Sequence, residues 1–131
     1  MKERKKSSTD FLIKKSSAFG EEAEEFACRY LKSKGYYILE RNYSCRFGEI
    51  DIIAKDAKTI CFIEVKARTN ISFGPPFIFV TAQKQSRIKK TALFFIATRK
   101  LSSLNYRFDV VSIVKNKKGS FEVELIKGAF E

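Results

Sequence analysis

Two carboxylates and one lysine near the middle of the chain have the types and the spacing that phosphate chemistry requires. Asp51 lies in the run from Gly48 to Ala54, and Glu64 and Lys66 lie in the run Ile63-Glu64-Val65-Lys66. Both runs alternate in the manner of β-strands, so Glu64 and Lys66 share one strand face. If the two strands pair as a hairpin, Asp51 lies beside Glu64 and Lys66.

A patch of this kind is costly in free energy without a bound partner. Neighbouring carboxylates repel each other, and an ammonium group between hydrophobic neighbours loses hydration. A divalent cation beside a phosphodiester would satisfy all three groups. The alternative is that Glu64 and Lys66 form an ion pair on a solvated strand face and that Asp51 faces water.

The elements that must position these residues follow from hydrophobic periodicity and from turn residues. Residues 67–76 form an irregular loop that starts where the Glu64 strand ends. A helix between the third and fourth strands makes those strands parallel, so we expect an α/β fold with a mixed sheet and helices packed on its faces. The expected helices cover 18–34 and 81–98, and the expected strands cover 36–42, 48–54, 60–66, 107–114 and 121–126.

Composition limits the class of protein and of partner. The chain has 131 residues, which suits one domain over 18–131 preceded by a basic flexible tail over 1–17. A net charge of +11 favours a polyanion, nucleic acid foremost, although a basic protein without a specific ligand has the same composition. No stretch is long and apolar enough to cross a membrane, and no secretory signal is recognisable, so we expect a cytoplasmic location.

The cysteines are three in number, are scattered, and are accompanied by no histidine. This pattern argues against a disulfide framework and against a zinc site, and it favours buried free thiols. Cys28 falls on the apolar side of the first helix, and Cys61 falls on the strand face opposite Glu64.

The wider pattern resembles a known family. Asp51 followed by Glu64-Val65-Lys66 resembles the PD-(D/E)xK nuclease signature, with Ile50 in place of its proline. The surrounding residues resemble the small YraN-type proteins, which are similar to archaeal-type Holliday-junction resolvases. The resemblance covers residues 18 to about 114 and is carried by Gly20, Glu24, Ala27, Tyr30, Leu31, Gly35-Tyr36, Ile38-Leu39, Arg41-Asn42, Gly48-Glu49-Ile50-Asp51, Phe62-Ile63-Glu64-Val65-Lys66, Phe73-Gly74 and Arg107-Phe108-Asp109-Val110-Val111.

This resemblance implies a restriction-endonuclease-like mixed sheet, a core order of αβββαβ and a single nuclease-like domain. It also implies that a glutamate on the first helix joins the strand acids, and the match falls on Glu24. Helical geometry supports this, because Gly20, Glu24 and Ala27 share a face that points to the sheet. Ala23 stands where the family usually has glycine.

The implied activity is metal-dependent hydrolysis of DNA phosphodiester bonds, plausibly in branched or structured DNA. Asp51 and Glu64 would hold Mg²⁺ or Mn²⁺, helped by a strand carbonyl and by Glu24 directly or through water. Lys66 would position or activate the nucleophile and offset charge on the scissile phosphate. Replacement of Lys66 should then harm chemistry more than binding.

Basic residues around this centre are candidates for contacts with the nucleic-acid backbone. They are Arg46, Arg68, Lys84 and Arg87, and for the two helical residues the alternative is a solvated basic face. Asp109 also belongs to the resemblance, but we expect it to satisfy backbone groups at the start of its strand.

Two other functions remain open from the sequence. One is a DNA-binding accessory protein that cleaves poorly and works with a repair or recombination partner. The other is a basic RNA-binding module without a metal site. Related resolvases pair in order to cut two strands, so a homodimer is possible, although no apolar stripe assigns its interface.

Overall fold

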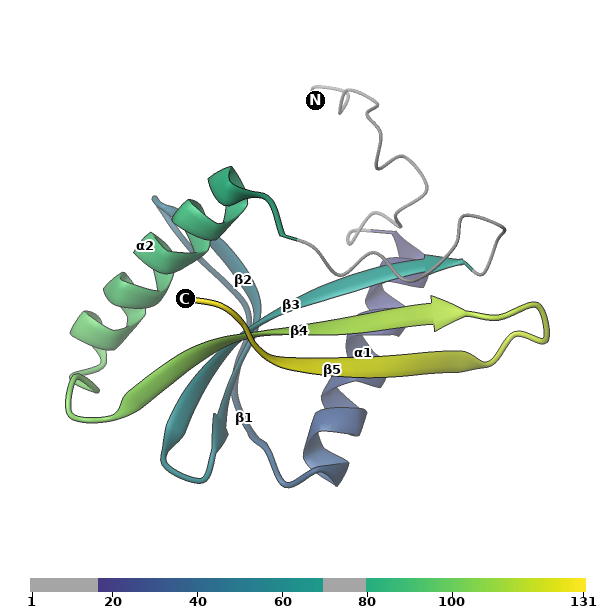
Figure 1. Cartoon of the computed structure of the whole chain (residues 1–131), viewed down its shortest axis with the longest axis horizontal. Coiled ribbons are helices and arrows are strands. Elements are labelled where there is room, and N and C mark those ends of the chain that lie inside the picture. Colours follow the sequence, from purple (N-terminus) through teal and green to yellow (C-terminus); the bar gives the residue numbers. More distant parts are fainter. Residues whose placement is uncertain (1–16, 70–79) are drawn as a thin grey trace.

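The computed structural model describes residues 17–69 and 80–131 (Figure 1). Two helices and five strands occur in the order that the sequence predicts. They are α1 (Ala18–Ser33), β1 (Tyr37–Cys45), β2 (Gly48–Asp56), β3 (Thr59–Thr69), α2 (Ala82–Thr98), β4 (Asn105–Lys115) and β5 (Phe121–Phe130).

The five strands form one mixed sheet in the order β1-β2-β3-β4-β5. Neighbouring strands are antiparallel except β3 and β4, which pair in parallel over their whole length. The parallel pair follows from the α2 crossover, because a chain that leaves one end of a strand must return to the other end to run in the same direction. The predicted α/β class and restriction-endonuclease-like core order are therefore confirmed, with β5 added at an edge.

Both helices begin and end at capping residues that the sequence supplies. The Ser17 side chain accepts a hydrogen bond from Gly20 N at 3.0 Å and caps α1, and Thr81 accepts one from Lys84 N at 3.2 Å and caps α2. Gly35, with φ of +93°, ends α1, since Tyr36 N then donates to Leu31 O at 3.0 Å. Ser17 thus belongs to the helix start, although the tail was expected to include it.

Each face of the sheet carries its own hydrophobic core. On one face α1 contributes Ala23 and Ala27, which lie in a cluster with Ile52 and Ile63 of the central strands. On the other face α2 packs Ile88 and Phe95 against residues that include Ile53 and Phe62. Alternate residues of β2 and β3 therefore point to opposite helices, as the period of two predicts.

The strands are longer than the sequence indicated. β3 continues to Thr69, so the expectation that a loop begins at residue 67 was wrong. The reason is the parallel partner, because β4 pairs with β3 as far as Thr69 opposite Lys115. The rest of that expected loop, residues 70–76, lies outside the described residues. The predicted fates of Cys28 and Cys61 are confirmed, since both thiols are free and buried.

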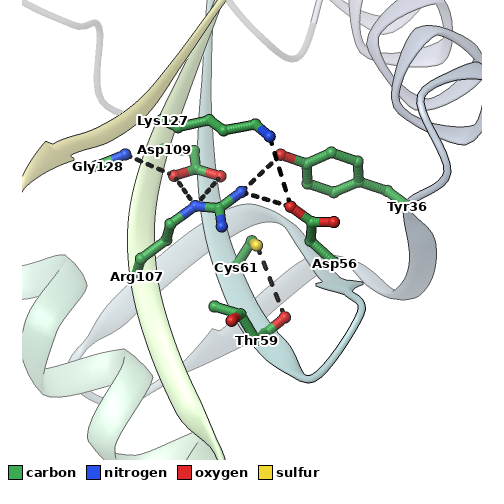
Figure 2. Close-up of polar contacts among 8 residues, drawn as sticks. All are labelled: Tyr36, Asp56, Thr59, Cys61, Arg107, Asp109, Lys127 and Gly128. Carbon is green, nitrogen blue, oxygen red and sulfur yellow. Dashed lines mark hydrogen bonds and ion pairs between the residues drawn. The ribbon is translucent and has the colours of Figure 1, made fainter.

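A polar network joins one end of the sheet to the corner between α1 and β1 (Figure 2). The Arg107 guanidinium donates to Asp109 at 2.9 Å, to Asp56 at 3.0 Å and to the Tyr36 hydroxyl at 2.7 Å. The fully buried Asp109 also accepts a bond from Gly128 N at 2.9 Å, where the β4–β5 pairing shifts register. The expected structural role of Asp109 is thereby confirmed.

We expect this network to make stability depend on pH through Asp56. The hydrogen bond from Arg107, aided by the charge of Lys127, lowers the pKa of Asp56. A depressed folded-state pKa contributes stability that is present at neutral pH and is lost as pH falls through it. Urea unfolding of wild type and Asp56→Asn should therefore differ by no more than about 1 kcal/mol at pH 7, because the pair is partly exposed, and the difference should shrink below about pH 4. A difference that grows on acidification would contradict this assignment.

Candidate functional site

The sheet divides at its centre, where β2 and β3 part. Their pairing begins at the hairpin turn and ends with Ile52 opposite Ile63. Beyond this pair β2 remains paired only with β1, and β3 only with β4. Figure 1 shows the first half of β2 rising toward α2 while the second half of β3 runs toward the start of α1. We call this opening the fork, defined by residues 48–51 of β2 and 64–69 of β3.

Asp51 and Glu64 are the first residues past the last pair of the two strands, one on each side of the fork. The Asp51 carboxylate accepts a hydrogen bond from Val65 N at 2.8 Å, so its side chain crosses from β2 to β3. Both acids are buried, with exposures of 6% and 4%. Regular alternation fails here, because Ile50 packs in the α2 core with Ile53 while Ile52 packs in the α1 core. Asp51 and Glu64 therefore flank the point where the two strands part, and their joint ligation of one cation stays a prediction.

The Val65 backbone adds a further oxygen to this place. A strand residue directs its N–H and its C=O to the same side, and the Val65 N–H points to Asp51. The Val65 carbonyl therefore lies on the fork edge of β3. It is a candidate for the strand carbonyl that the resemblance implies.

Glu64 has a lysine from α2 beside it. Lys84 Nζ lies 2.7 Å from Glu64 Oε2, and the Lys84 side chain is 46% exposed while that of Glu64 is 4% exposed. The ion pair places Glu64 on the α2 face of the sheet. Lys66, two residues further along β3, shares that face by alternation and is partly exposed. The sequence indicated Lys66 as the cationic neighbour of the acids. The structure adds Lys84 of α2 as a second cation.

Glu24 approaches the sheet from the other face. It is 5% exposed and lies on the α1 stripe that includes Ala23 and Ala27, whereas Glu21, Glu22 and Glu25 are exposed. The selection of Glu24 as the sheet-facing acid is confirmed. Within 17–69 and 80–131, however, no three histidine, cysteine, aspartate or glutamate side chains are grouped so that they could hold one ion. The role of Glu24 in holding a cation, either directly or through water, therefore stays a prediction.

The donor chemistry of the fork nevertheless fits a hard divalent cation. Mg²⁺ is commonly held by only one or two carboxylates, with waters and phosphate oxygens in the remaining positions. Asp51 and Glu64 supply two buried carboxylates, and a carboxylate that accepts one hydrogen bond retains further acceptor sites. A cation would also offset the cost of burying two negative charges in one part of the sheet.

The basic residues expected around the site fall into two groups. Arg46 and Arg87 are exposed, and the Arg46 guanidinium lies 4.9 Å from the centre of the Phe47 ring. Arg68 is only 4% exposed. It lies in the part of β3 that borders the fork, and its expected contact with a nucleic-acid backbone stays a prediction.

Gly48 brings α2 and its basic residues close to the fork. It has φ of +149°, and a Cβ at this position would lie 3.2 Å from Thr91 Oγ1 and 3.5 Å from Arg87 Cβ. A larger residue would therefore strain the backbone and push α2 away. Sequence reasoning missed this spacing role and also missed the contact of Lys84 with Glu64. The sequence did carry one signal that Lys84 has a negative partner, because a lysine in the first turn of a helix opposes the helix dipole.

No helix in the described part of the chain combines the length and the apolar character needed to cross a membrane.

Comparison with known proteins finds one family and relatives that cover most of the chain. The model of the uncharacterised protein family UPF0102 matches residues 23–113, a range that contains all four residues of the predicted catalytic set. A UPF0102 protein of Syntrophus aciditrophicus is 51% identical over 112 residues, covering 86% of this chain and 87% of the relative. A UPF0102 protein of Geotalea uraniireducens is 47% identical over 116 residues, covering 88% and 91%. One of Clostridium acetobutylicum is 41% identical over 121 residues, covering 92% and 97%.

Proposed function

The chain belongs to the UPF0102, or YraN-type, family within the PD-(D/E)xK nuclease-like superfamily, and from this premise we propose that it is a metal-dependent endonuclease acting on DNA. Branched or structured DNA is the substrate in this proposal. The observation that carries the proposal is the fork, where a buried aspartate and a buried glutamate are the first residues past the last pair of two diverging strands, and the aspartate accepts a 2.8 Å bond from Val65 N.

Asp51 and Glu64 hold the cation in this proposal, with the Val65 carbonyl as a further oxygen. When bound, Mg²⁺ or Mn²⁺ lowers the pKa of a coordinated water and neutralises charge on the phosphate. The chain's own residues do the remaining work. The hydrogen bond from Val65 N fixes the orientation of the Asp51 carboxylate, and burial excludes competing water from both acids.

Lys66 acts on the substrate side of the site. It lies on the same strand face as Glu64, and its flexible stem carries a compact positive charge. We assign it the positioning of the attacking water and the stabilisation of the negative charge that develops on the phosphodiester. Glu24 supports the site from the α1 face through water.

The polyanion is drawn to the site by charge. The net charge of +11 provides long-range attraction, and the exposed Arg46 and Arg87 lie near the start of β2 and on α2. A basic rim around an acidic centre attracts the backbone, whereas the centre retains the cation.

Cleavage assays test the proposal. Purified protein with Mg²⁺ or Mn²⁺ is incubated with linear, flapped and four-way DNA, beside Lys66→Ala. Lys66→Ala should reduce the cleavage rate by about 10² to 10³, since it removes an interaction made mainly in the transition state, and should change DNA affinity by less than about tenfold. Lys55→Ala, at the far end of β2 from the fork, serves as the control for loss of one strand lysine.

A second candidate function is a DNA-binding accessory protein that cleaves poorly. It is favoured by the ion pair between Lys84 and Glu64, since a site acid already neutralised by a lysine needs no metal to be stable. Equal DNA binding by wild type and Lys66→Ala with no cleavage by either would support this function over the nuclease. Binding that persists undiminished at high salt would count against backbone contacts in both.

A further inference from the structure

Lys84 occupies an unusual place for a lysine. It lies in the first turn of α2, a turn that contains no acidic residue, although a helix N-terminus disfavours positive charge. Its ammonium is 2.7 Å from Glu64 Oε2 and not turned outward to solvent. This contact puts a positive charge at an oxygen that the proposed function gives to a divalent cation.

We propose that Lys84 is an exchangeable counter-ion that couples binding of the divalent cation to binding of the nucleic-acid phosphate. The proposal rests on the proposed function and adds a regulatory step to the same site. With no cation bound, Lys84 neutralises Glu64. When a cation takes the Glu64 oxygen, Lys84 swings outward and pairs with a backbone phosphate of the substrate.

The geometry permits this movement without a change in the fold. The cap at Thr81 holds the first turn of α2 by its backbone, through the 3.2 Å bond from Lys84 N, so the Lys84 side chain is not needed to anchor the helix. That side chain is nearly half exposed, while its partner is almost fully buried. A lysine side chain has a flexible four-carbon stem, so the ammonium can leave the carboxylate and reach solvent.

Electrostatics then dictates the sign of the coupling. A divalent cation and an ammonium at the same carboxylate repel each other, so binding of the cation favours the departure of Lys84. A phosphate nearby gives the displaced ammonium a new partner and lowers the free energy of that displacement. DNA should therefore tighten cation binding, and by reciprocity the cation should tighten DNA binding by the same factor.

The test is a Mn²⁺ titration of the full-length chain, with free Mn²⁺ measured by electron paramagnetic resonance. Lys84→Met keeps most of the stem and removes the charge. Lys90→Met is the matched control, because it removes the same charge from an exposed position of the same helix. Without DNA, Lys84→Met should bind Mn²⁺ at least about fivefold more tightly than wild type, and Lys90→Met should bind like wild type.

The second arm adds a four-way DNA junction in a Lys66→Ala background, in which the expected slow hydrolysis leaves the junction intact during the measurement. There the junction should tighten Mn²⁺ binding when Lys84 is present and should leave it unchanged when position 84 is methionine. Thermal melting of each variant verifies that it is folded.

Each outcome has one meaning. If Lys84→Met behaves like Lys90→Met in both arms, the proposed exchange is wrong, although the metal site stands. If Glu64→Gln does not weaken Mn²⁺ binding, the assignment of the metal site is wrong, and the proposed exchange is wrong with it.

Discussion

Asp51→Asn is expected to weaken Mn²⁺ binding by at least about a hundredfold, or about 2.7 kcal/mol, while the domain stays folded. Asparagine keeps an oxygen that can accept the hydrogen bond from Val65 N, so the side chain can still bridge the fork. It loses the negative charge that a hard cation requires. It also removes a buried negative charge, which is costly to bury, so the melting temperature should not fall. Calorimetric titration of Mn²⁺ and thermal melting measure the two quantities.

Glu49→Gln is the matched control for this substitution. Glu49 is the preceding acid on the same strand and is exposed, so its replacement removes a carboxylate two residues away and leaves the two buried acids, Asp51 and Glu64, in place. Its Mn²⁺ affinity should equal that of wild type. If both substitutions weaken binding alike, the cation responds to the general charge of the surface, and the fork is not its site.

Asp109→Ala is expected to destabilise the domain by about 3 kcal/mol or more, because it leaves a partly buried guanidinium without its buried partner. The Asp109 carboxylate is fully buried and binds Arg107 and Gly128 N. Without it, the backbone N–H of Gly128 loses its acceptor where the β4–β5 pairing shifts register. A loss of this size is a large fraction of the stability of a typical domain, so urea unfolding should show it clearly.

Asp109→Asn separates the two contributions. The amide oxygen can still accept the Gly128 N–H bond, but the charge that pairs with Arg107 is gone, so the loss should be smaller than in Asp109→Ala. The network lies where β3 and β4 begin, whereas the fork involves the second half of β3. Folded Asp109→Asn should therefore bind Mn²⁺ like wild type, and weakened binding would contradict a purely structural role.

Together the two substitutions separate function from stability in this fold. Asp51 is a buried acid at a place where strands diverge, and its replacement should affect cation binding but not folding. Asp109 is a buried acid satisfied by an arginine and a backbone amide, and its replacement should affect folding but not cation binding. The two carboxylates differ in their surroundings and not in their burial, which is nearly the same.

The sequence alone determined the order of the elements and the parallel relation of β3 and β4. Alternation, helical periodicity and capping residues are local signals, so Gly35 and Thr81 mark helix ends without tertiary information. The family resemblance selected Glu24 among four neighbouring acids, and helical geometry agreed with that choice. These features depend on residues near one another in the chain.

The tertiary structure decided what depends on distant partners. The pairing of Lys84 with Glu64 joins α2 to β3, and the identity of this partner depends on how the two elements pack. The burial of Arg68 and the extension of β3 to Thr69 depend on strands that meet only in the folded sheet. The fork itself exists because β2 stays with β1 while β3 stays with β4, and that division of partners is a property of the whole sheet.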